Sequence, residues 1–118
     1  MNIRILSSAY NDLVAGKKFY DRQNEGLGEY FLDTLFSDID SLMLHGGVHR
    51  KVYGYHRLLS KRFPYAIYYK MDNRRDILVW RVLDCRQDPK NIKKALKYQT
   101  ILKDKNFNNN ETIFDNNC

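Results

Sequence analysis

The sequence has few cysteines, no long apolar run and no secretory signal. Its only cysteines are Cys85 and Cys118, which provide neither a disulfide framework nor the ligand spacing of a metal site. No apolar stretch approaches the roughly 20 residues that a membrane helix requires. The opening MNIRILSSAY lacks the basic and then apolar order of a signal peptide. These absences predict a reduced, cytoplasmic protein that uses no metal or cofactor and does not associate with a membrane.

The composition is typical of one globular domain. The chain has 118 residues, of which 43% are hydrophobic and 29% are charged, and this length suits a single two-layer core. From residue 104 onward, the sequence DKNFNNNETIFDNNC is rich in asparagine and poor in apolar residues, which is typical of disordered segments. We therefore predict one domain over residues 1–103 and a disordered tail over residues 104–118.

Charge is unevenly distributed along the chain. Residues 1–45 carry four Lys or Arg against seven Asp or Glu, a net charge of −3. Residues 46–105 carry sixteen against five, a net charge of +11. Basic residues on strands and loops can simply be solvated, but a domain polarised in this way also attracts polyanions or acidic partners. The size of the asymmetry favours a binding role.

Hydrophobic periodicity predicts an α+β domain. Apolar residues recur at helical spacing in two segments near the N-terminus and alternate in the segments after Gly46-Gly47. Ser7 or Ser8 is expected to cap the first helix, and Asp88-Pro89 has the residues expected at the start of the last one. The predicted order is a strand at 2–6, helices at 7–23 and 29–47, strands at 53–61, 63–71 and 76–85, and a helix at 88–103.

These elements predict a small, mostly antiparallel sheet with helices packed on one face. Consecutive helices with short connections pack as a hairpin, and three consecutive strands with short links form an antiparallel meander. Alternation in the last strand gives one apolar set on one side of the sheet, formed by Leu78, Trp80 and Val82. If Trp80 faces the helices, Arg81 emerges on an open face, where it could bind an anion. Alternatively, Arg81 pairs across strands with a carboxylate.

Four segments form a recognisable combination. They are RILSSAYNDL, the two-helix segment, YGYHRLLSKRFPYAIYYKM and ILVWRVLDCRQDP. The most specific part is RVLDCRQDP, in which a strand runs into Arg86 and then into Asp-Pro and a helix. This combination resembles the RelE/ParE superfamily of small bacterial toxins from type II toxin–antitoxin systems, over residues 1–97. The resemblance implies the fold predicted above and a partner antitoxin, whose C-terminal segment commonly wraps the toxin.

The resemblance implies two different activities. RelE-like members cleave mRNA at the ribosome without a metal, using Arg and Lys to stabilise charge and a Tyr or another group as acid or base. ParE-like members inhibit DNA gyrase and are not known as nucleases. Arg86 falls where RelE-like nucleases hold an arginine, but Ala66 and Ile92 stand where those nucleases hold a second arginine and a tyrosine. These two departures favour gyrase inhibition.

A nuclease could still use a different set of groups. If the chain cleaves RNA, its candidate catalytic residues are Arg86, His56 and Arg62, with His56 the best acid or base by side-chain type. A strand histidine is more often a surface or packing residue, and Arg62 could equally pair with a carboxylate such as Asp33. Nuclease chemistry therefore remains the alternative prediction.

Basic residues of the second half are predicted to bind a partner or a nucleic acid. An acidic or amphipathic antitoxin segment could dock on them by strand addition or as a helix, although the lysines could instead form a solvated face. The predicted function is a growth-inhibiting toxin that is neutralised by an antitoxin and targets DNA gyrase. The alternatives are a toxin that targets the ribosome with its mRNA, and a non-toxic binding module. The predicted binding residues are Arg57, Arg81, Arg86, Lys90, Lys93, Lys94 and Lys97.

Overall fold

The computed structural model describes residues 2–105, with side chains described for residues 2–97. The predicted tail lies outside the described residues from residue 106 onward, and residues 104 and 105 belong to the last helix. In chain order, the elements are β1 (Ile3–Ile5), α1 (Ser7–Gln23), α2 (Leu27–Asp40), α3 (Leu42–His45), β2 (Lys51–Val52), β3 (Tyr55–Leu59), β4 (Tyr65–Met71), β5 (Ile77–Asp84) and α4 (Pro89–Lys105).

The described strands form one mixed sheet of five strands in the order β1-β5-β4-β3-β2. The N-terminal β1 pairs in parallel with β5, whereas β2 to β5 pair with one another as an antiparallel meander. The predicted α+β architecture is confirmed. The short β2 was not predicted, and it forms one edge of the sheet.

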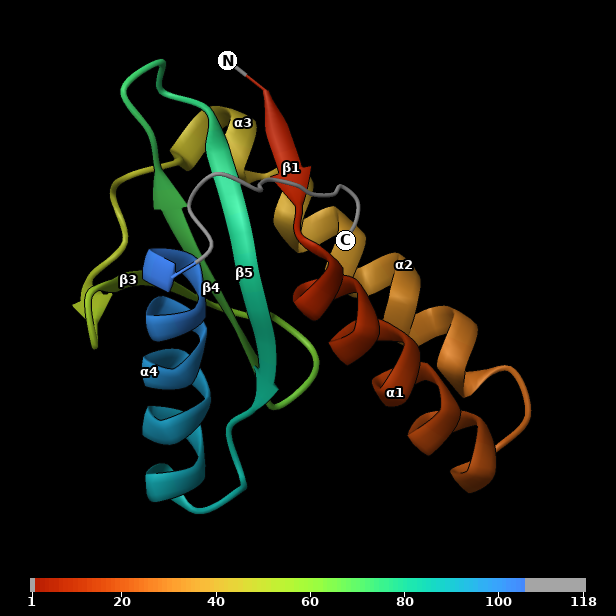
Figure 1. Ribbon diagram of the computed structural model, residues 1–118. Helices are drawn as coiled ribbons and strands as arrows, with labels where there is room; N and C mark the ends of the chain where they lie inside the picture. Colours follow the sequence, from red (N-terminus) through yellow and green to blue (C-terminus); the bar gives the residue numbers. More distant parts are fainter. Residues whose placement is uncertain (1, 106–118) are drawn as a thin grey trace.

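Helices lie against both faces of the sheet. Figure 1 shows α1 and α2 running alongside each other as the predicted hairpin, and α4 crossing the opposite face. The hairpin covers a cluster that contains Phe31, Leu35 and Val79, all with 0% of their surface exposed. The second cluster lies beneath α4 and contains Trp80 and Leu96. The face that was expected to be open is therefore partly covered by α4.

An irregularity in β5 corrects the predicted faces of this strand. Tyr68 is opposite Arg81 and Tyr69 is opposite Val79, so Trp80 is an extra residue without a partner in the register. Such a bulge interrupts the alternation of side chains. Trp80 consequently faces α4, while Val82 lies in the cluster beneath the hairpin. The prediction that Trp80 and Val82 share one face was wrong.

Several predicted ends also differ. The second helix begins at Leu27 and ends at Asp40, with α3 as a separate turn, and the predicted strand at 53–61 begins only at Tyr55. No side chain caps α1, because Ser8 lies inside the helix and its hydroxyl donates to the carbonyl oxygen of Trp80 at 2.7 Å. Asp88 does cap α4, since its carboxylate accepts the N–H of Lys90 at 2.9 Å.

Candidate functional site

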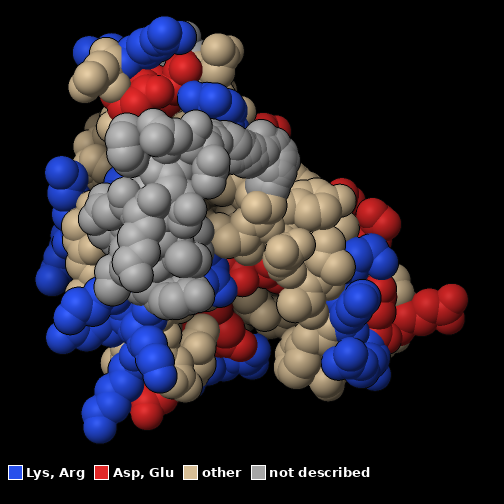
Figure 2. Space-filling view, in the orientation of Figure 1, with Lys and Arg blue, Asp and Glu red and all other residues tan. Residues whose placement is uncertain are grey.

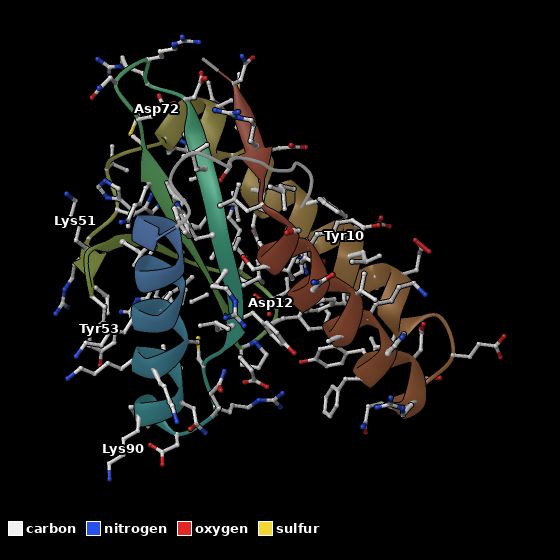
Figure 3. The ribbon with its side chains drawn as sticks, in the orientation of Figure 1. Tyr10, Asp12, Lys51, Tyr53, Asp72 and Lys90 are labelled. Atoms are coloured by element: carbon white, nitrogen blue, oxygen red, sulfur yellow. The ribbon has the colours of Figure 1, made fainter. Side chains whose placement is uncertain are left out.

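Basic side chains without an ion pair among the described residues gather where α4 lies beside the β2–β3 edge of the sheet. Figure 2 shows Lys and Arg side chains concentrated on this side of the molecule, and Figure 3 places Lys51, Tyr53 and Lys90 there. We call this region the cationic surface. It consists of Tyr53, Arg57, Lys90, Lys93, Lys94 and Lys97.

The helix α4 supplies four of these residues because it is amphipathic. Its inner side places Leu96 in the core with 0% of its surface exposed, with Ile92 and Ala95 packed against the same cluster. All four lysines of the cationic surface are exposed. Apolar burial on one side thus orients the lysines outward.

The turn between β2 and β3 holds an aromatic ring beside these lysines. Tyr53 has a positive φ of 54° and is followed by Gly54 with φ 85°. A positive φ is uncommon for a residue other than glycine, and strained residues are concentrated at functional sites. The Tyr53 side chain is about half exposed, and the Nζ of Lys93 lies 5.9 Å from the centre of its ring. The Tyr-Gly pair was a turn signal that the sequence reasoning missed.

Arg57 is the arginine of β3 that completes the cationic surface. It is directly opposite Tyr68 of β4, and within the described part of the chain it forms no ion pair with a carboxylate. Burial raises the pKa of the Tyr68 phenol, and the charge of Arg57 opposes that rise. Arg57 is partly exposed, so its guanidinium can donate two hydrogen bonds to an external anionic group.

Arg81 is not part of an open basic face, as one reading of the sequence predicted. Its Nε donates to Oδ2 of Asp12 at 2.8 Å and its second guanidinium nitrogen donates to Oδ1 at 2.9 Å. The two side chains are only 21% and 15% exposed. Burial raises the pKa of Asp12, although Arg81 and the N–H of Val82 oppose this rise. The alternative prediction was a pair with a carboxylate across strands. Arg81 does pair with a carboxylate, but that of Asp12 on α1 rather than one on a strand. A binding role for Arg81 stays a prediction.

Arg86 has a carboxylate partner as well. It donates to Asp84 at 2.7 and 3.0 Å, which raises the pKa of Arg86. Its guanidinium carbon lies 5.9 Å from the centre of the Phe19 ring of α1. A nearby depression of about 300 Å³ is lined by Phe19, Asp84 and Tyr65 among others. Arg86 therefore lies between α1 and the end of β5, and its predicted binding and catalytic roles stay predictions.

The candidate nuclease residues occupy separate surroundings. His56 points toward the hairpin side, where its ring stacks on Tyr69 with centres 5.0 Å apart and its Nδ1 lies 2.7 Å from the carbonyl oxygen of His49. Arg62 lines a different depression, beside Asp33 and other residues of α2. The described contacts do not join either residue to Arg86.

A neighbouring phenol does not supply the missing base. Burial raises the pKa of Tyr65, which lines the depression near Arg86, to about 12. A phenol with such a pKa stays protonated at neutral pH and is a poor proton acceptor. The arrangement supports binding of an anionic group more directly than it supports acid–base catalysis.

The described residues contain neither a candidate metal site nor a membrane-spanning helix. Their His, Cys, Asp and Glu side chains form no group of three that could hold a metal ion. Throughout the same part of the chain, no helix combines the length and apolar character needed to span a bilayer.

Comparison with known proteins identifies the fold. No family model matches the sequence, and no curated protein matches it. One similar solved structure carries the description "Chromosomal ParDE TA system from P. aeruginosa". Its matching chain is 18% identical with a TM-score of 0.62, and the match covers 70% of this chain and 92% of that chain. The predicted RelE/ParE-like fold is therefore confirmed.

Proposed function

We propose that this protein is the toxin of a toxin–antitoxin pair, that it acts in the cytoplasm by binding rather than by cutting RNA, and that DNA gyrase is its target. The observation that carries the proposal is the structural match, which covers 92% of a chain from a ParDE toxin–antitoxin system. The sequence resemblance points to the same superfamily through residues in four segments.

The cationic surface supports the antitoxin part of the proposal. Arg57 and the four exposed lysines of α4 have no carboxylate partners among the described ion pairs. An acidic polypeptide segment would provide those partners, and complementary charge speeds association and selects the correct partner. We therefore assign the cationic surface to antitoxin binding.

The separation of the candidate nuclease groups supports a non-catalytic mechanism. Metal-independent RNA cleavage needs an acid or base and a charge-stabilising group within reach of one phosphate. Here Arg86 is held by Asp84, His56 is stacked on Tyr69, and Arg62 lies beside α2. Inhibition of gyrase, which the ParE-like resemblance implies, needs no such assembly.

The test separates target from toxicity. The chain is expressed alone and then together with the product of the neighbouring reading frame, which we expect to be a small acidic protein, and growth is followed. Purified protein is then added to DNA gyrase in a supercoiling assay, and mRNA from induced cells is examined by primer extension. We expect growth arrest, rescue by the neighbour, loss of supercoiling and intact mRNA. Cuts near the ribosomal A site would favour the nuclease instead, and unimpaired growth would favour a non-toxic binding module.

A further inference from the structure

Two of the three histidines of the chain, His49 and His56, contact one buried tyrosine, and the third, His45, lies close enough to His49 for its charge to act on it. Tyr69 of β4 has 0% of its surface exposed. Its hydroxyl oxygen accepts the N–H of Gly47 at 2.9 Å and lies 2.5 Å from Nδ1 of His49. The ring of His56 stacks on the Tyr69 ring at an angle of 24°. The Tyr69 hydroxyl thus fastens the segment between α3 and β2 to the sheet through two of its residues, Gly47 and His49.

The hydrogen-bond partners determine where the protons lie. A carbonyl oxygen only accepts, so the Nδ1 of His56, 2.7 Å from the carbonyl oxygen of His49, must carry a proton. The hydroxyl oxygen of Tyr69 already accepts the N–H of Gly47. In the described contacts, the hydroxyl proton of Tyr69 has the Nδ1 of His49 as its available acceptor. His56 therefore keeps its bond when it becomes charged, whereas His49 accepts from Tyr69 only while its Nδ1 is unprotonated.

We propose that His49 is a pH-sensitive latch, and that its protonation releases residues 46–52 from the sheet. A proton on Nδ1 turns His49 from acceptor to donor at the Tyr69 hydroxyl. The oxygen of Tyr69 then faces donors from both Gly47 and His49, and its own proton loses its acceptor. A buried donor without a partner is unfavourable, so the closed arrangement is weakened.

The surroundings of His49 do not compensate for a positive charge. His56 faces it from β3, Tyr69 from β4 and His45 from α3, and Arg50 follows it in the chain. Among the described residues, none of the three histidines forms an ion pair with a carboxylate. Burial, followed by the charges of His56 and His45, lowers the pKa of His49 from its ordinary value of 6.5.

The sign of the pH effect follows from this lowered pKa. At a pH well above 6.5, His49 is neutral in both the closed and the released states. As the pH falls below that value, the released state gains the proton first, so acid favours release. The effect grows until the pH reaches the lowered pKa of the closed state.

Release would reach the edge of the sheet. Arg50 accepts the N–H of Arg57 at 3.0 Å, and Lys51 is opposite His56 in the β2–β3 pair. Loosening residues 46–52 therefore frees the edge strand that leads into Tyr53. The latch does not depend on the proposed function, but it would connect pH to one border of the cationic surface.

Amide hydrogen exchange and NMR titration of the full chain test the latch. Exchange of the Gly47 amide, corrected for the intrinsic effect of pH, is expected to accelerate as the pH falls below about 6.5, by up to about tenfold per unit. In the same protein, the ring signals of His49 are expected to titrate below the ordinary pKa of 6.5. A Gly47 amide whose corrected exchange does not change, or a His49 whose pKa is 6.5 or higher, would overturn the proposal.

Two matched variants isolate the titrating group. His49→Asn keeps a side-chain oxygen that can accept from Tyr69 but cannot be protonated, so its corrected Gly47 exchange should not depend on pH. His45→Gln removes a neighbouring histidine that is exposed and should retain most of the acceleration. If His49→Asn retained the wild-type pH dependence, another group would be the latch; the NMR titration decides the question should this variant fail to fold.

Discussion

Arg81 of β5 and Asp12 of α1 form a two-bonded ion pair across 69 residues of sequence. The same carboxylate accepts the N–H of Val82 at 2.9 Å, which is the backbone group two residues after the extra residue Trp80. The pair therefore ties α1 to β5 beside the bulge. The charge of Arg81, which one reading of the sequence assigned to an open binding face, here joins a helix to the sheet.

Asp12→Asn is expected to destabilise the protein by about 3 kcal/mol, because it leaves a largely buried guanidinium without a counter-charge. The change in the free energy of unfolding can be measured by urea denaturation. Arg4→Gln is the control, because the Arg4–Asp72 contact at 3.9 Å involves an Arg4 side chain that is 58% exposed, and such pairs contribute at most about 1 kcal/mol. Equal effects of the two substitutions would contradict a structural role for Asp12.

The sequence predicted the order of elements because that order depends on local signals. Apolar spacing gave the helix hairpin and the meander, and Asp88-Pro89 gave the start of α4, where the Asp88 carboxylate caps the helix. The bulge could not be predicted, because an extra residue in β5 has no local signature and depends on its pairing with β4. Because Trp80 is the extra residue of the bulge, strict alternation along β5 assigns the residues after it, such as Val82, to the wrong face of the sheet.

The candidate site was predicted in part. Lys90, Lys93, Lys94 and Lys97 are exposed on the same helix as their spacing indicated, since helix periodicity is local. The partners of Arg81 and Arg86 were not foreseen, because Asp12 is distant in sequence and Asp84 comes close only where the chain turns after β5. Strain at Tyr53 was also missed, because the predicted strand began there.

Tyr53→Asn is expected to separate stability from binding. Asn tolerates a positive φ better than Tyr, so relief of a strain of about 1 kcal/mol should offset the lost contact with Lys93 and leave thermal stability unchanged or raised. Antitoxin affinity, measured by calorimetry, should fall because the exposed ring is removed.

Arg75→Asn provides the matched control for Tyr53→Asn. Arg75 also has a positive φ, of 66°, but it lies in the turn between β4 and β5. This variant should raise stability by about 1 kcal/mol without a change in antitoxin affinity. If Tyr53→Asn left the affinity at the wild-type value, Tyr53 would not belong to the binding surface.

Arg57→Glu is expected to lower antitoxin affinity by at least about tenfold, or about 1.4 kcal/mol, because it places a like charge against an acidic segment. Calorimetry at two salt concentrations measures the loss, which should shrink as salt screens the charges. Arg74→Glu makes the same change of charge at an exposed residue of the β4–β5 turn and should have little effect. Equal losses for both variants would indicate a general effect of net charge rather than a site at Arg57.

His56→Gln and Arg62→Gln test whether the chain acts by catalysis. Glutamine at position 56 can still donate to the carbonyl oxygen of His49, which the Nδ1 of His56 approaches at 2.7 Å, so the fold should be retained. Removal of a catalytic acid or base lowers a rate by a factor of about 100 or more, whereas a binding toxin has no such step to lose. We therefore expect both variants to arrest growth and to inhibit supercoiling as the wild type does, with folding checked by circular dichroism. The binding mechanism would be rejected by two results together: the wild type causes mRNA cleavage, and a folded variant no longer arrests growth. The substituted residue would then belong to a nuclease site.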